Sequence, residues 1–264
     1  STVELLPLVL VLLAGPSATG LREIPLNMTQ TAFDDQYRGC REEMMQELPA
    51  LNSTEFSTNT LYAQVWAKAT AQWQRTGGSR LWPELAIALL AYTMKTDLFR
   101  VFNEAMRKGG RSRREYLENF HFKVLHFLIT EAVKDLRKAK SHPKCLHVYR
   151  GVRDVQFTAK PGQTIRFGQF TSTSRRKDVA HKFGTDTFFK VKTCHAASTR
   201  HFSSFSSEME VLIPPFEMFK VVKVTHHGHK TQIQLRSHGV YSKYNCEWLQ
   251  GDIPGMGTPT VGHG

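Results

Sequence analysis

The first half of the chain repeats apolar residues at helical spacing, from about residue 34 to residue 140. Residues 82–94 carry a proline near their start, where a helix tolerates it, followed by Ala and Leu, which favour helix. Residues 117–136 place apolar side chains at i, i+3 and i+4 over about five turns, which predicts a long amphipathic helix. Basic residues crowd the end of this helix, and Ser141-His142-Pro143 ends it.

After Cys145 the apolar pattern changes from helical spacing to alternation. Short alternating runs between Gly- and Pro-containing turns predict strands at residues 146–150, 164–170, 187–192, 208–213, 217–225 and 231–235. The strands do not alternate with helices, which disfavours a parallel nucleotide-binding sheet. The predicted fold class is therefore α+β, with a helical N-terminal half packed on a β-rich second half.

Both ends of the chain differ from this folded region. Residues 5–14 are almost wholly apolar and residues 15–20 are small. This pattern is typical of a secretory signal peptide at residues 1–20 rather than of a membrane span, which needs roughly 20 apolar residues. Residues 252–264 are polar and Gly-rich, so we expect a flexible tail. They lack the hydrophobic run of a lipid-anchored precursor, and we therefore expect a secreted protein without a membrane anchor.

The cysteines agree with export. An even number of them favours two disulfides in an oxidising compartment, with three possible connectivities. The cysteines after the predicted signal peptide are Cys40, Cys145, Cys194 and Cys246. None belongs to a Cys-x-x-Cys pair, so zinc binding and redox chemistry are not indicated. Two sequons, at Asn27 and Asn52, predict glycosylation on the same route.

The chain is strongly basic, with 35 Lys and Arg against 23 Asp and Glu among 264 residues. Clusters at residues 107–114 and 175–177 suggest an inactive polyanion-binding protein as one hypothesis, because cationic patches attract polyanions without specificity. In an exported protein we interpret this as a side property, and we expect no specific nucleic-acid partner. His226, His227 and His229 lie in a predicted turn without a neighbouring carboxylate, so no metal site is expected.

Three short motifs in the β-rich half carry candidate chemistry. Alternation along residues 208–213 places Glu208 and Glu210 on one strand face, about 7 Å apart, after a Ser-rich loop that contains Phe205. Taken alone, such a pair is typical of a solvated strand face. Arg150 ends an apolar strand, and Ser172 stands in a Thr-Ser-Thr-Ser run before a predicted helix at residues 175–183. Each also has an ordinary explanation, as surface charge or as a helix cap.

Together these motifs resemble the arginine-specific mono-ADP-ribosyltransferases, in which an arginine, a Ser-Thr-Ser run and aromatic-x-x-Glu-x-Glu follow in this order. Residues 32–37, 91–93, 149–151 and 210–215 also resemble the secreted and lipid-anchored vertebrate ecto-enzymes. The resemblance covers residues 21–250. It implies one catalytic domain of the ADP-ribosyltransferase fold at residues 21–251, acting as a monomer. It also implies NAD, or NADP, as co-substrate, with no permanently bound cofactor and no metal.

The resemblance implies a role for several residues. Arg150 should clamp the anionic part of NAD, and Gly151 should let the backbone approach the nicotinamide carboxamide. Ser172 should hold Glu210 and help to bind the nicotinamide ribose. Phe183 is expected to stack on the nicotinamide. Further positions that match NAD contacts of the family are Tyr92, Gln169 and Ser203.

The two glutamates are expected to act in different steps. Glu210 should stabilise the oxocarbenium-like transition state that forms when nicotinamide leaves. Glu208 and Phe205 should bind the acceptor, an arginine of a target protein or a small guanidino compound, with Glu208 taking its proton. Water as acceptor would give an NAD glycohydrolase on the same site. The acidic Glu208 favours transfer. The resemblance also implies the disulfide pairs Cys40–Cys246 and Cys145–Cys194.

Overall fold

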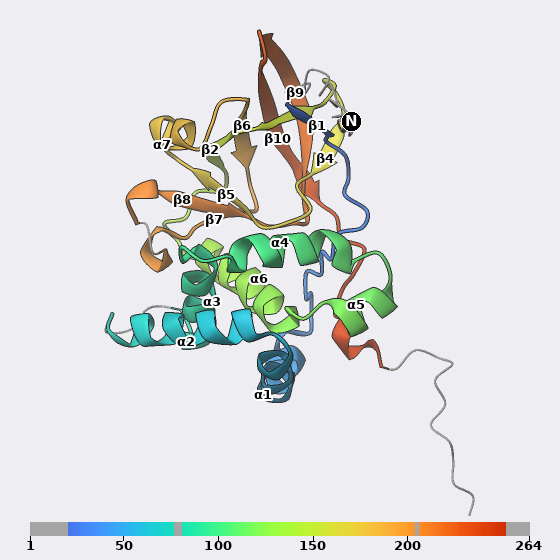
Figure 1. Cartoon of the computed structure of the whole chain (residues 1–264), viewed down its shortest axis with the longest axis vertical. Helices are drawn as coiled ribbons and strands as arrows, with labels where there is room; N and C mark the ends of the chain where they lie inside the picture. Colours follow the sequence, from blue (N-terminus) through green and yellow to red (C-terminus); the bar gives the residue numbers. More distant parts are fainter. Residues whose placement is uncertain (1–20, 77–80, 204–205, 252–264) are drawn as a thin grey trace, which may run out of the picture.

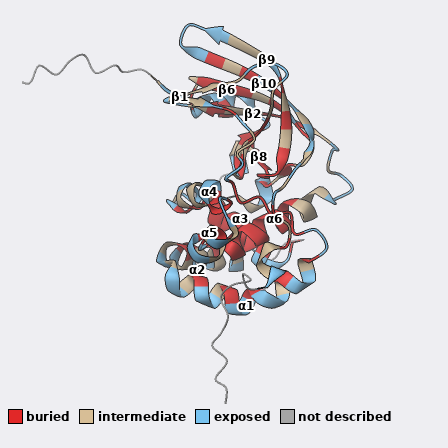
Figure 2. Ribbon diagram, turned by 90° about the vertical axis from the view of Figure 1, so that its right-hand side faces the viewer, coloured by how far each residue is buried: buried red, intermediate tan, exposed pale blue. Residues whose placement is uncertain are grey.

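The computed structural model describes residues 21–76, 81–203 and 206–251, which form a helical half and a β-rich half (Figure 1). The helical half consists of α1 Arg41–Thr58, α2 Thr60–Gln74, α3 Pro83–Thr93, α4 Leu98–Gly109, α5 Arg113–Asn119 and α6 Lys123–Arg137. Helices α3 and α6 are the most buried, and they occupy its centre (Figure 2). The predicted α+β architecture is confirmed.

The β-rich half is built around one bent sheet with the strand order β4-β9-β10-β6-β2-β5-β8-β7. Neighbouring strands are antiparallel except β6 and β10, which run parallel. The strands after α6 are β2 Leu146–Val152, β3 Val155–Thr158, β4 Thr164–Arg166, β5 Thr171–Ser174, β6 Thr187–Thr193, β7 Ala197–Ser198, β8 Glu210–Ile213, β9 Glu217–His227 and β10 Lys230–Val240. Strand β1, Arg22–Pro25, pairs with β3, so the first described residues lie beside the β-rich half.

Strand β8 separates two apolar cores. Its residue Leu212 packs into the core of the helical half, together with Phe170, which precedes β5. Val211 and Ile213 point the other way, into the core of the sheet. Because side chains alternate along a strand, Glu210 shares the face of Leu212 and is directed toward the helical half.

The predicted long helix at residues 117–136 is wrong, because the chain breaks between α5 and α6. Helix α6 begins at Lys123, and the buried carboxylate of Glu55 accepts hydrogen bonds from the backbone N–H groups of Lys123 and Val124, at 2.7 and 2.8 Å. These bonds satisfy donors that a helix start leaves unpaired. The cap comes from α1, far away in the sequence, so apolar spacing cannot show it.

The predicted strand at residues 164–170 is also wrong in length. It ends at Arg166, whose buried guanidinium donates to Asp34 Oδ2 at 2.5 Å, and Gly168 then turns the chain at φ +69°. The predicted helix at 175–183 is reduced to α7, Lys177–Lys182. The hydroxyl run before it forms strand β5. His226 and His227 end strand β9 instead of lying in the turn, and both are exposed.

Both predicted disulfides are present. Cys40–Cys246 joins the residue before α1 to the segment after β10, and Cys145–Cys194 joins the residue before β2 to the residue after β6. Asp35 reinforces the first bridge, because its buried carboxylate accepts a hydrogen bond from the backbone of Cys246 at 2.9 Å. Within the described ranges no helix combines the length and apolar character that crossing a bilayer requires.

Candidate active site

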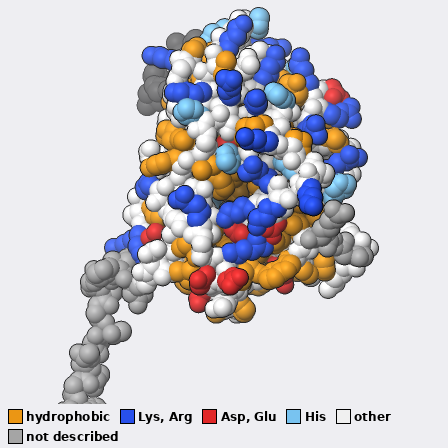
Figure 3. Space-filling model, turned by 180° about the vertical axis from the view of Figure 1, so that it is seen from behind, with side chains coloured by type: hydrophobic (Ala, Val, Ile, Leu, Met, Phe, Trp, Pro, Cys, Tyr) orange, Lys and Arg blue, Asp and Glu red, His pale blue; other side chains and the backbone are white. Residues whose placement is uncertain are grey.

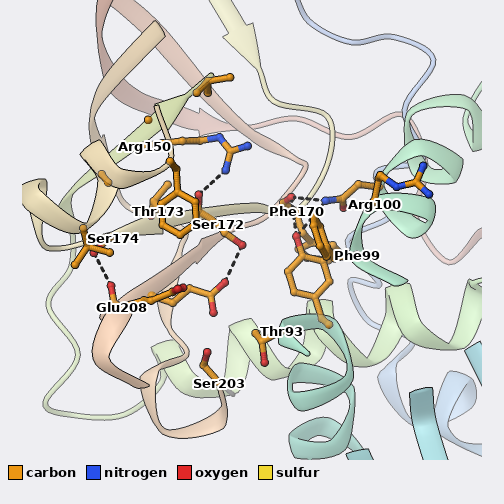
Figure 4. Close-up of a pocket in the computed structure, with 18 of the residues that line it drawn as sticks. Thr93, Phe99, Arg100, Arg150, Phe170, Ser172, Thr173, Ser174, Ser203 and Glu208 are labelled. Atoms are coloured by element: carbon orange, nitrogen blue, oxygen red, sulfur yellow. Dashed lines mark hydrogen bonds between the residues drawn. The ribbon is translucent and has the colours of Figure 1, made fainter. Parts of the chain in front are cut away.

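A cavity of about 570 Å³ lies where the two halves meet, a volume in the usual range for ligand pockets. One wall consists of α3, α4 and the segment between them. The other consists of β2, β5, β8 and α7 (Figure 4). The predicted site residues that line this cavity are Tyr92, Arg150, Gly151, Gln169, Ser172, Phe183, Ser203, Glu208 and Glu210. Phe205 lies outside the described residues.

Glu210 is the buried carboxylate of the cavity. It is the first residue of β8, only 6% exposed, and its Oε1 accepts a hydrogen bond from Ser172 Oγ at 2.8 Å. Burial raises the pKa of the Glu210 carboxyl, while the Ser172 hydroxyl works against this rise and repulsion from Glu208 adds to it. The expected contact between Ser172 and Glu210 is confirmed.

Arg150 completes a chain of contacts across the sheet. Strands β2 and β5 form a ladder pair only at Tyr149 and Ser174. The Arg150 side chain reaches from β2 to β5, and its Nη1 donates to the Ser172 carbonyl at 2.8 Å (Figure 4). Ser172 therefore contacts Arg150 through its backbone and Glu210 through its hydroxyl. Three residues that are distant in the sequence form one connected unit in the cavity wall.

Glu208 reaches the cavity by a different route from the predicted one. It ends the 3₁₀ turn Ser206–Glu208, and Met209 after it adopts a left-handed backbone with φ +50°. The expectation that the two glutamates share one face of a regular strand is therefore wrong. Ser174 Oγ donates to the Glu208 carbonyl at 2.5 Å and ties the turn to β5. The half-buried Glu208 side chain nevertheless lines the cavity, and burial raises the pKa of its carboxyl.

Comparison with known proteins agrees with this geometry. The family model NAD:arginine ADP-ribosyltransferase matches residues 26–243. The chain belongs to this family. It is 46% identical to the Gallus gallus protein NAD(P)(+)--arginine ADP-ribosyltransferase 2, over 99% of this chain and 90% of the relative. It is 45% identical to the GPI-linked NAD(P)(+)--arginine ADP-ribosyltransferase 1 of Mus musculus, over 87% and 74%.

A solved structure shows the same fold. A variant of the eukaryotic mono-ADP-ribosyltransferase ART2.2 in complex with NAD superposes with a TM-score of 0.73 at 33% identity, covering 84% of this chain and 98% of that one. The fold of this ADP-ribosyltransferase is therefore that of a family member crystallised with NAD.

Gly151 of the ADP-ribosyltransferase is required by the chain's own packing. A Cβ at this position would lie 2.2 Å from the Ala180 carbonyl oxygen and 2.3 Å from that of Gly184. Real Cβ atoms do not approach backbone so closely, so only glycine fits between β2 and α7. The expected contact with nicotinamide stays a prediction, and it would have to use the backbone N–H or C=O of Gly151.

The remaining predicted NAD contacts lie around the cavity. Tyr92 is buried, its hydroxyl donates to the Phe170 carbonyl at 3.1 Å, and burial raises its pKa to about 12. Gln169 accepts a hydrogen bond from Arg107. Phe183, at the end of α7, is 54% exposed, which leaves its ring available to a ligand. Ser203 also lines the cavity.

Helix α4 supplies cavity residues that sequence reasoning missed. Asn103 is buried in the middle of α4, and its Nδ2 donates to the Tyr92 hydroxyl at 3.1 Å and to the Phe170 carbonyl at 3.3 Å. Arg107, one turn later, is exposed and donates a hydrogen bond to Gln169. The sequence offered one signal for this wall, the amide side chain of Asn103 in the middle of an amphipathic helix. Once buried, such an amide requires hydrogen-bond partners.

Proposed function

We propose that this ADP-ribosyltransferase transfers ADP-ribose from NAD to arginine side chains of proteins or to small guanidino acceptors, with release of nicotinamide. One observation carries the proposal: Arg150, Ser172 and Glu210 form a connected unit in a cavity that Glu208 also lines. The printed names of the relatives, which include NAD(P) and arginine, support both co-substrates and admit NADP beside NAD.

The first step breaks the bond between nicotinamide and ribose. The electron pair leaves with nicotinamide, which becomes neutral, so no general acid is needed. Positive charge develops on the ribose, and the carboxylate of Glu210, held by Ser172, stabilises it. The guanidinium of Arg150 provides donors to the anionic part of NAD on the same wall. Low exposure strengthens these interactions because little water screens them.

The second step forms the bond between the acceptor and the ribose. A guanidino nitrogen attacks the anomeric carbon, and its proton passes to Glu208, which lines the same cavity and is less buried than Glu210. Burial raises the pKa of Glu208 and makes it a better proton acceptor than an exposed glutamate. Phe205 would offer a ring for the planar guanidinium.

A comparison of Glu208→Gln with Glu210→Gln tests this assignment. We expect Glu210→Gln to lower transfer to agmatine and NAD cleavage by water together, by about 10²–10³-fold, because both reactions share the departure of nicotinamide. Glu208→Gln should abolish transfer while cleavage by water continues. The measurements are labelled-NAD consumption and ADP-ribosyl-agmatine formation, with thermal melts to confirm folding. Equal loss of NAD cleavage in the two folded variants would show that the division of roles is wrong.

The described structure also supports secretion. Two disulfides are typical of proteins folded in an oxidising compartment. Asn27 is exposed and accessible to glycosylation, whereas Asn52 Oδ1 accepts a hydrogen bond from the Tyr62 hydroxyl at 2.9 Å. We propose a secreted monomeric enzyme with glycan at both sequons. Expression in a secretory cell line should give protein in the medium whose mass falls on enzymatic deglycosylation, and retention inside the cell would contradict the proposal.

A further inference from the structure

One exposed face of the sheet carries basic side chains in cross-strand register. His147 of β2 pairs with Lys192 of β6, Lys192 pairs with Arg236 of β10, and Arg236 pairs with Lys220 of β9. A second row on the same face contains Lys190 of β6 and Lys223 of β9, with Tyr149 and Gln234 as the other members. We call these two rows the cationic face. No Asp or Glu occupies either row.

Such an arrangement is unfavourable without a partner. Like charges directly opposite each other on neighbouring strands destabilise a sheet. An ordinary solvated face relieves this with carboxylates, yet His147, Lys190, Lys192, Lys223 and Arg236 form no hydrogen bond or salt bridge through their side chains within the described part of the chain. Only the Lys220 ammonium has a partner there, the carbonyl of Gly162 at 3.0 Å.

The cationic face is also hollowed. A groove of about 410 Å³ runs over it, lined by His147, Tyr149, Lys190, Lys192, Gln234 and Arg236 among others. Its walls are partly shaped by a bulge in β9, where the register with β10 shifts between Gln234 and Leu235. The view from behind shows that Lys and Arg dominate the visible surface of the β-rich half, while most visible acids lie lower, toward the helices (Figure 3).

We propose that the cationic face, none of whose basic residues lines the NAD cavity, binds a sulfated glycosaminoglycan chain. Neighbouring strands lie about 4.8 Å apart, so Lys192, Arg236 and Lys220 of the first row present closely spaced cations to an extended polyanion that crosses the strands. Nucleic acid is disfavoured because single strands need exposed aromatic rings for stacking, and the ring of Tyr149 stacks on Phe188 instead. Disulfides also point to an oxidising compartment, where sulfated glycans occur.

Heparin binding by the full chain tests the proposal. The test variant combines Lys190→Gln, Lys192→Gln and Arg236→Gln, none of which lines the NAD cavity. A matched control removes the same charge from exposed sites before α1, on α2 and directly after α2, through Arg38→Gln, Lys68→Gln and Arg75→Gln. Dissociation constants are measured across a salt series with heparin, desulfated heparin, polyglutamate and a single-stranded oligonucleotide. NAD turnover with agmatine should be the same in all three proteins.

We expect heparin affinity to depend on the residues of the cationic face and on the sulfate groups of the ligand. At about 0.15 M salt the test variant should lose heparin affinity by on the order of tenfold or more, and the slope of log Kd against log salt should fall by about three. The control should lose much less, and desulfated heparin should not bind. Equal losses in the two variants would show that only net charge matters. Equal affinity for desulfated heparin, polyglutamate or the oligonucleotide would overturn the assignment to a sulfated glycan.

Discussion

Replacing Glu210 with Gln should stabilise the protein at neutral pH while it removes the activity. Glu210 is 6% exposed, and burial raises the pKa of its carboxyl above the ordinary value of 4.5. At neutral pH, folding therefore buries a carboxylate in surroundings that favour its protonated, uncharged form. Glutamine has nearly the same shape, carries no charge and still offers an oxygen to the Ser172 hydroxyl.

Two opposing contributions set the size of this effect. The 2.8 Å bond from Ser172 changes from a charge-assisted to a neutral hydrogen bond, which costs about 1 kcal/mol. Removal of the buried charge, and of its repulsion by Glu208, contributes more in the stabilising direction. We expect a net gain of about 1–2 kcal/mol, comparable with other substitutions that exchange function for stability. In a domain of this size that corresponds to a rise in Tm of about 2–8 °C.

Thermal melts across a pH series measure the effect. Because the folded-state pKa of Glu210 is raised, its carboxyl is protonated in both states below about pH 4.5 and imposes no penalty there. The penalty grows as the pH rises and is complete above the folded-state pKa. The Tm difference between Glu210→Gln and wild type should thus vanish in acid and be largest at neutral pH. A lower Tm of the variant at neutral pH, or a constant difference at every pH, would refute the reasoning.

Further predictions concern packing and covalent links. Gly151→Ala should destabilise the fold by more than about 3 kcal/mol, seen as lost yield or a lowered Tm, because its Cβ would come within 2.3 Å of two backbone oxygens. Asp34→Asn should cost about 3–5 kcal/mol in urea unfolding, because it leaves the charge of the buried Arg166 unpaired. Joint replacement of Cys145 and Cys194 by Ser should lower the unfolding free energy by about 4 kcal/mol, as loop entropy predicts for this separation.

The sequence predicted the arrangement of the fold better than its boundaries. Periodicity separates the helical half from the β-rich half because burial of one face is encoded locally in every element. The predicted boundaries of helices and strands were wrong where a residue distant in the sequence determines the boundary. Helix α6 begins where Glu55 accepts a hydrogen bond from the backbone N–H of Lys123. Strand β4 ends where the buried side chain of Arg166 pairs with Asp34. Neither contact leaves a trace in the local pattern of apolar residues.

The candidate site divides in the same way. Arg150, Ser172 and Glu210 could be named because short motifs resemble those of a known family, and the structure joins them by hydrogen bonds. The backbone between the two glutamates could not be predicted, since Met209 is left-handed, a conformation that its side chain disfavours. Alternation assumes a regular strand and therefore places Glu208 wrongly on β8.

Both halves of the molecule form the cavity, which explains why one of its walls was not predicted from the sequence. Strand β8, which pairs with β5 along its whole length, carries Glu210 on one wall. The opposite wall is α4, whose Asn103 is bonded to Tyr92 and to the backbone just before β5. The same amide thus joins the helical core to the strand that carries Ser172. The distance across the cavity is set by core packing between the halves, and no motif within either half could reveal it.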